Sequence, residues 1–120
     1  MPQLGPESSA SPIVSIVEPT DGCNQICESL TVRGTCSNCG AVKVTVNGDT
    51  QTASINFGLG TWDAGPFNFN VATLSECQNK ASSKKNHIVA VGTSDSPEDP
   101  ESATAEQDFW AHRDGCPSVV

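Results

Sequence analysis

The chain has 120 residues, which fits a single domain with one modest core. Only 36% of the residues are hydrophobic and none is Tyr, so the core must be small and rich in Val and Ile. The formal net charge of −8 argues against nucleic-acid binding, because phosphates attract clustered Lys and Arg. No apolar run reaches the roughly 18 residues of a membrane-spanning helix, so we expect no membrane span.

Six cysteines, an even number in a short and loop-rich chain, indicate disulfide bonds and an oxidising compartment. We therefore expect an extracellular, cell-surface or periplasmic protein. The first residues, MPQLGPESSASP, are polar and lack the basic start and apolar segment of a signal peptide. We interpret residues 1–12 as a flexible linker or the remnant of a cut in a longer protein, 13–116 as the domain, and 117–120 as a C-terminal tail.

Alternation of apolar and polar residues predicts the first two strands. The first covers residues 13–17 and ends at the turn PTDG (19–22), since Pro cannot donate a ladder hydrogen bond and Asp-Gly turns readily. A loop with the sequence CNQICES leads to the second strand, over residues 30–35. The segment CSNCG (36–40) then makes a tight corner.

The clearest element is a hairpin over residues 41–57. Its first strand alternates Val with Ala, Lys and Thr, a pattern typical of a half-buried strand. Asn47-Gly48 follows and favours a two-residue turn, because both residues tolerate a positive φ. The chain should then return as one strand that ends at Phe57.

Three more strands are predicted at residues 67–72, 87–93 and 104–112. The middle one contains an unbroken apolar run and should be the most buried. In the last strand, Phe109 should face the core and Trp110 the opposite side. Seven strands at this spacing indicate an all-β sandwich. The predicted core consists of Val14, Ile16, Leu30, Val32, Val42, Val44, Val46, Ile55, Phe57, Trp62, Phe69, Val89, Val91 and Phe109.

Six short motifs extend over most of the chain beyond residue 12. They are VSIVEPTDG (14–22), LTVRGT (30–35), VKVTVNG (42–48), GTW (60–62), HIVAVGTSD (87–95) and FWAH (109–112). In this order they resemble the strands of bacterial immunoglobulin-like modules of secreted and surface proteins. The chain departs from that pattern by its six cysteines and by the missing Asp-x-x-Gly-Asn turn after the penultimate strand.

The resemblance implies an immunoglobulin-like β-sandwich of about seven strands, stapled here by disulfides. Modules of this kind act as spacers or as adhesion and protein-interaction units, so we expect neither enzymatic activity nor a cofactor. The expected partners are neighbouring domains of a longer chain, and surface proteins or glycans. In isolation the domain should be a monomer.

Strand alternation sorts the cysteines between the two poles of the sandwich. Cys36 and Cys39 fall alone at one pole and should bond to each other. The other pole holds Cys23, Cys27, Cys77 and Cys116. A zinc site built from the pairs at 23/27 and 36/39 is disfavoured, because the poles should lie about 20 Å apart.

The pairing of those four cysteines follows from the resemblance. In an immunoglobulin-like sandwich the first strand runs beside the last, which predicts a Cys23–Cys116 bond. The second strand begins where the fifth ends, which predicts Cys27–Cys77. The alternative at the same pole is Cys23–Cys27 together with Cys77–Cys116.

An acidic loop between the last two strands is the candidate calcium site. It offers carboxylate oxygens, the ligands that Ca²⁺ prefers. Its members are Asp95, Glu98, Asp99 and Glu101. Their spacing matches no EF-hand and Pro97 and Pro100 stiffen the loop, so a solvated acidic loop without metal is favoured.

Two further candidates concern catalysis and sugar binding. His87 and His112 are the only histidines, and neither stands beside a recognisable nucleophile motif, which disfavours a small secreted hydrolase. Trp110, on the face opposite to the core, is the candidate ligand-binding residue, because sugar rings stack on exposed aromatic side chains. A carbohydrate-binding module is therefore the main alternative function.

Overall fold

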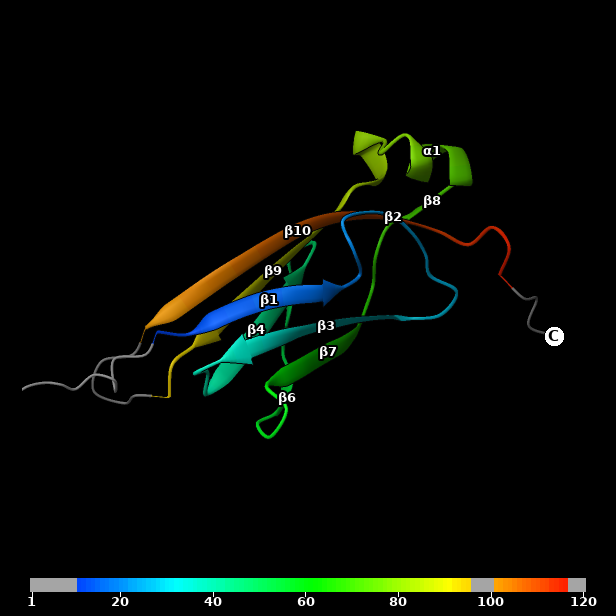
Figure 1. Ribbon diagram of the computed structural model, residues 1–120. Coiled ribbons are helices and arrows are strands. Elements are labelled where there is room, and N and C mark those ends of the chain that lie inside the picture. The colour runs from blue at the N-terminus through cyan, green and yellow to red at the C-terminus, as the bar shows by residue number, and fades with distance from the viewer. Residues whose placement is uncertain (1–10, 96–100, 117–120) are drawn as a thin grey trace, which may run out of the picture.

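Two β-sheets enclose the core in the computed structural model, which describes residues 11–95 and 101–116 (Figure 1). The first has the order β1-β3-β7-β6, with strands Ile13–Glu18, Leu30–Ser37, Thr61–Phe67 and Ser54–Asn56. The second has the order β2-β10-β9-β4-β5, with strands Gly22–Gln25, Ser102–His112, Asn86–Thr93, Ala41–Val46 and Asp49–Thr52; β8, Val71–Ala72, also pairs with β10. Helix α1, Leu74–Gln78, and a 3-10 turn, Ser82–Lys84, precede β9.

The strand order is that of an immunoglobulin-like sandwich. One sheet of that architecture corresponds to β1, β3, β7 and β6, and the other is built around β10, β9 and β4. The predicted all-β, disulfide-bonded sandwich is therefore confirmed. The predicted number of about seven strands was wrong, because the described residues form ten.

Tertiary pairing creates strands that local pattern did not predict. The sequence of β2, GCNQ, has no apolar alternation, and it is a strand because it pairs in parallel with β10. The return strand of the central hairpin is divided, since β5 pairs with β4 whereas β6 pairs with β7 in the other sheet. Ala53 lies between them and donates its backbone N–H to the carbonyl of Val42 at 2.8 Å, which marks the crossing point.

The strand predicted at 67–72 had the wrong bounds: within that range only the short β8 forms after Phe67, and the long strand lies earlier in the chain, as β7. It pairs with β3, with Thr61 opposite Thr35 and Phe67 opposite Leu30. Gly65 and Pro66 suggested a break, but they lie at a shift in the pairing register, where Pro is tolerated because its nitrogen is not needed for the ladder. Phe67 therefore enters the core in place of Phe69, which is only partly buried.

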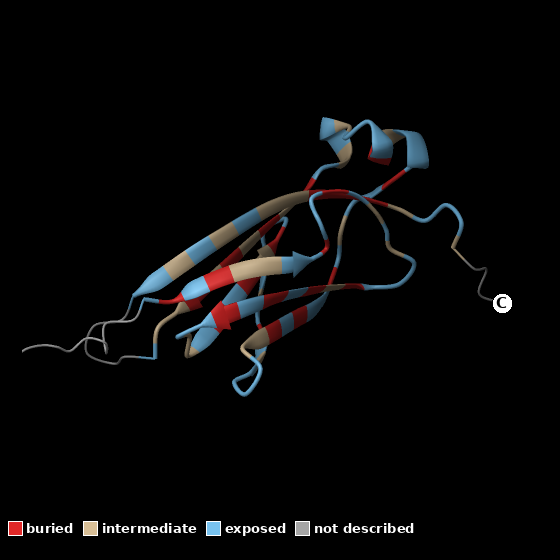
Figure 2. Ribbon diagram, viewed as in Figure 1, coloured by how far each residue is buried: buried red, intermediate tan, exposed pale blue. Residues whose placement is uncertain are grey.

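Most of the predicted core is confirmed. Figure 2 shows the alternation of buried and exposed residues along β3 and β7. Ile16 and Ile55 are partly buried and pack against the core. The predicted members that are buried are Val14, Leu30, Val32, Val42, Val44, Val46, Trp62 and Phe109.

Two other core predictions were wrong. In β9, Ile88 and Ala90 are buried, whereas Val89 and Val91 are only partly covered. The unbroken apolar run gave no sign of which face points inward, and a shift of one residue exchanges the two faces of a strand. Phe57 is 70% exposed, because β6 ends at Asn56 and the chain turns away toward β7.

A buried amide fixes the register of β9. The side chain of Asn86 is fully buried and accepts hydrogen bonds from Asn47 Nδ2 at 2.8 Å and from the backbone N–H of Asn70 at 2.6 Å. Its own Nδ2 donates to the carbonyl of Asn70 at 3.0 Å. Asn47 in turn accepts from the backbone N–H of His87 at 2.9 Å. One side chain thus joins the central hairpin turn, the segment after β7 and the start of β9.

Replacing Asn86 by Ala should lower the free energy of unfolding by about 1–3 kcal/mol, because the backbone groups of Asn70 lose their partner. Urea denaturation measures the loss. The matched control is Asn68→Ala, an exposed amide in the same segment, for which a change within about 0.5 kcal/mol is expected. Equal midpoints for the two variants would contradict the role assigned to Asn86.

Candidate functional site

The six cysteines form three disulfides, at both poles of the sandwich. The bonds are Cys23–Cys77, Cys27–Cys116 and Cys36–Cys39. The predicted Cys36–Cys39 bond and the grouping of the other four cysteines agree with the structure. The predicted bonds Cys23–Cys116 and Cys27–Cys77 were wrong, because their partners are exchanged. No thiol stays free for the zinc site that was considered.

The exchange follows from the course of β2. This strand runs parallel to β10, with Cys23 opposite Trp110 and Gln25 opposite His112. The pairing continues beyond β2, since Ile26 donates its N–H to the carbonyl of His112 at 3.1 Å. Cys27 is thereby carried past the end of β10 to the segment that contains Cys116, and Cys23 is left beneath α1.

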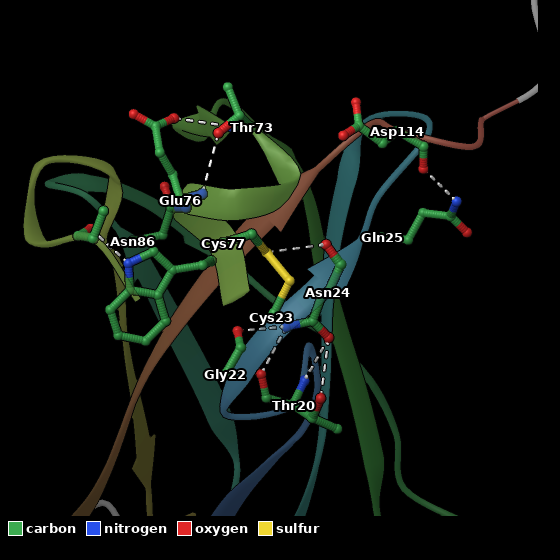
Figure 3. Close-up of a disulfide and its surroundings, with 12 residues drawn as sticks. Thr20, Gly22, Cys23, Asn24, Gln25, Thr73, Glu76, Cys77, Asn86 and Asp114 are labelled. Carbon is green, nitrogen blue, oxygen red and sulfur yellow. Dashed lines mark hydrogen bonds between the residues drawn. A yellow bond between two sulfur atoms is a disulfide. The ribbon is translucent and has the colours of Figure 1, made fainter. Parts of the chain in front are cut away.

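The partner of Cys23 comes from helix α1, which the sequence analysis missed. Cys77 is the buried residue of this helix, and its Cα lies 5.1 Å from that of Cys23 (Figure 3). Thr73 and Glu76 form a capping box: the Thr73 N–H donates to Glu76 Oε1 at 2.9 Å, and the Glu76 N–H donates to Thr73 Oγ1 at 3.1 Å. The Thr-x-x-Glu spacing was the signal that could have found the helix.

Helix α1 and the residues after it cover Trp110. Its ring faces away from Phe109, as predicted, but it packs with Ala72 and Cys77 and is only 7% exposed. The indole N–H donates to the carbonyl of Ala81 at 2.8 Å, and Lys80 Nζ lies 6.0 Å from the ring centroid. Trp110, the candidate ligand-binding residue, therefore offers no open platform for a sugar and instead anchors the helix to the sheet.

One histidine lies beside the disulfide under α1. A ring nitrogen of His112 and the sulfur atoms of Cys23 and Cys77 lie within 4.8 Å of one another. His112 Nδ1 is buried and finds no hydrogen-bond partner among the described residues. Because the sulfurs of Cys23 and Cys77 are bonded to each other, only the imidazole of His112 remains as a good metal ligand in this group.

The other histidine lies in a cluster of charged groups on the outer face of β9 and β10. His87 Nδ1 is 2.6 Å from Asp108 Oδ1, and His87 Nε2 is 3.0 Å from Glu106 Oε1. Lys85 Nζ lies 4.0 Å from the second oxygen of Asp108. No sequence pattern connects His87 with these carboxylates; the antiparallel register that sets Asp108 opposite His87 brings them together.

The two carboxylates raise the pKa of His87 above its ordinary value of 6.5, chiefly because the protonated ring donates a hydrogen bond to Asp108, against a smaller opposing effect of burial. Both ring nitrogens are engaged by carboxylates. The shallow depression around the ring is otherwise lined by Asp21 and Gln107, so it holds no hydroxyl or thiol nucleophile. The cluster can bind a proton, but it lacks the elements of a hydrolytic triad.

The acidic loop lies only partly within the described residues. Glu98 and Asp99 fall outside them. Glu101 accepts a hydrogen bond from Ser11 Oγ at 2.6 Å, and Asp95 lies against Gly40. In the described part of the chain, neither carboxylate belongs to a convergent group of three metal-ligating side chains, and the favoured interpretation, a solvated loop without metal, stays a prediction.

Comparisons with known proteins do not assign this chain to a family. No protein-family model matches the sequence, and no curated protein matches it either. Among the described residues, no helix has the length and apolar character required to cross a membrane.

The His87 cluster predicts a titration that NMR can follow. The imidazole of His87 should titrate above pH 6.5, and Asp108→Asn should lower its midpoint because the main hydrogen-bond partner loses its charge. Since the pKa is raised on folding, the cluster stabilises the fold fully below pH 6.5 and this contribution disappears as the pH rises through the folded-state pKa.

Asp63→Asn, an exposed carboxylate on β7 in the other sheet, is the matched control and should leave the midpoint unchanged. The side chain of His87 is 44% exposed, so solvent screening limits the stabilisation to about 1 kcal/mol or less. A wild-type midpoint at or below 6.5 would contradict the assignment.

Proposed function

We propose that this domain is a non-enzymatic, immunoglobulin-like module of an extracellular, cell-surface or periplasmic protein, and that it acts as a spacer or as a protein-contact unit between neighbouring domains. The motifs that resemble bacterial immunoglobulin-like modules support this proposal, since they occupy β1, β3, β4, β9 and β10 and the start of β7. The disulfides support the compartment, because such bonds persist in oxidising environments.

The single observation that carries the spacer function is the position of the two ends. Asn38 in the corner between β3 and β4 donates a hydrogen bond to the carbonyl of Ser11 at 3.2 Å, so the chain enters beside the Cys36–Cys39 pole. It leaves at Cys116, at the opposite pole (Figure 1). Modules whose chain enters at one pole and leaves at the other can be joined end to end without doubling back.

Charge at the two poles favours such a joint. Lys84 and Lys85 lie just before β9, and Asp95 and Glu101 lie at its other end. One copy would therefore present these lysines to Asp95 and Glu101 of the next. Attraction between exposed charges of this kind is weak and screened by salt, so it would orient neighbouring modules rather than hold them.

A chain containing two copies in tandem tests the proposal. Small-angle X-ray scattering should give an extended particle with about twice the length of one copy, because each copy begins where the preceding one ends. The interdomain freedom, measured by NMR relaxation, should increase at high salt as the charges are screened.

The control is the same two-copy chain with Lys80, Lys84 and Lys85 replaced by Ser, which should be extended but insensitive to salt. A compact two-copy particle would contradict the spacer function. Retardation of the single domain by polysaccharides in affinity gels would favour the carbohydrate-binding alternative instead.

A further inference from the structure

We propose that the Cys27–Cys116 disulfide is a covalent strap that carries tension between the two ends of the domain, so that pulling on the ends cannot unravel residues 28–115. The biological use of the strap rests on the proposed spacer function. Its mechanical effect depends only on which atoms are bonded, and the two can be tested separately.

The path of tension follows from the chain and its crosslinks. Force applied at Ser11 passes along β1 from one pole to the other, continues through β2 and reaches Cys27. There the disulfide leads directly to Cys116, the end of the described chain, although 89 positions separate the two cysteines in sequence. The whole sandwich from β3 onward therefore lies in a closed loop outside the path of tension.

The slack in this path is small. Residues 13–27 can span at most about 50 Å when fully extended. Much of that length is already used, because β1 and β2 are extended strands that run in the direction of the pull (Figure 1). Hydrogen bonds beside the strap support it: the backbone N–H of Ile26 donates to the carbonyl of His112, and the side chain of Gln25 donates through Nε2 to the carbonyl of Asp114 at 2.8 Å.

The Cys23–Cys77 disulfide forms a second stop behind the first. While Cys27–Cys116 is intact, the bond at Cys23 lies on a longer route and carries no tension. If Cys27–Cys116 is opened, tension passes from Cys23 to Cys77 and then along residues 77–116. The module would then lengthen by about 120 Å before stopping again. Cys27–Cys116 therefore bears the tension first, and Cys23–Cys77 bears it only after the first bond has been opened.

Single-molecule force spectroscopy on the full chain, held at its two ends through peptide tags, tests this order. The wild type should show no extension step beyond the slack of residues 13–27. The double variant Cys27→Ser/Cys116→Ser should extend about 120 Å further. Replacing all four cysteines of the pole by Ser should add about 300 Å, since 89 positions then lie in the path.

Two matched controls remove a disulfide without opening the strap. Cys23→Ser/Cys77→Ser and Cys36→Ser/Cys39→Ser should both extend no further than the wild type. Once the remaining native disulfides have formed, the final stretched length depends on covalent connectivity alone, so a variant of low stability still gives an answer. A phosphine reductant added to the wild type should reproduce the longest extension.

A wild-type extension near 300 Å would overturn the proposal, as would lengthening in the Cys23→Ser/Cys77→Ser control. These results are distinguishable from failure of the proposed function. A compact two-copy particle in scattering would remove the spacer role while leaving the strap intact, whereas a long wild-type extension would remove the strap and leave the spacer role to stand.

Discussion

The parallel pairing of β2 with β10 is the contact on which the C-terminal pole of the molecule depends. It sets Cys23 beside Trp110 and carries the chain beyond His112 to Cys27. From that register follow the two disulfides at this pole, the attachment of α1 and the burial of Trp110. A strand of four residues with little propensity of its own therefore determines more of the tertiary structure than the strongly patterned hairpin does.

Trp110 and His87 share one property: the side chain of each is occupied by contacts within the domain. The aromatic ring that could have met a sugar is packed under α1, and the imidazole that could have taken a proton from a substrate is held by two carboxylates. The charged groups of the chain are predominantly acidic, and a few large apolar side chains, among them Phe57 and Leu59, are also exposed. An acidic excess of this kind agrees with the proposed weak, salt-dependent contacts between neighbouring modules.

The two poles are reinforced in different ways. At one, Cys36 and Cys39 close a short corner, and their sulfurs pack against Gly92, where a side chain would not fit. A disulfide that closes so short a loop removes little freedom from the unfolded chain, so its role is local. At the other pole, the two long-range disulfides enclose large loops and join the first strands to the end of the domain. In the proposed strap, these bonds determine which segments of the chain extend when the two ends are pulled apart.

Sequence by itself determined the features that depend on local pattern. Period-two alternation revealed β1, β3, β4 and their inward Val residues, because each side chain's face is set by its neighbours along the strand. The even number of cysteines predicted the disulfides, and Asn47-Gly48 predicted the hairpin turn, without a structure. Strand alternation also made the Cys36–Cys39 bond predictable, since it left these two cysteines alone at one pole.

Tertiary structure alone decided what depends on contacts between distant segments. The inward face of β9 is set by the burial of Asn86, which its uniform apolar run does not reveal. The return strand is divided at Ala53 because its first part, β5, pairs with one sheet and its second part, β6, pairs with the other. The exchange of disulfide partners depends on how far β2 runs along β10, and a displacement of four residues, from Cys23 to Cys27, is enough to change which cysteine meets Cys77.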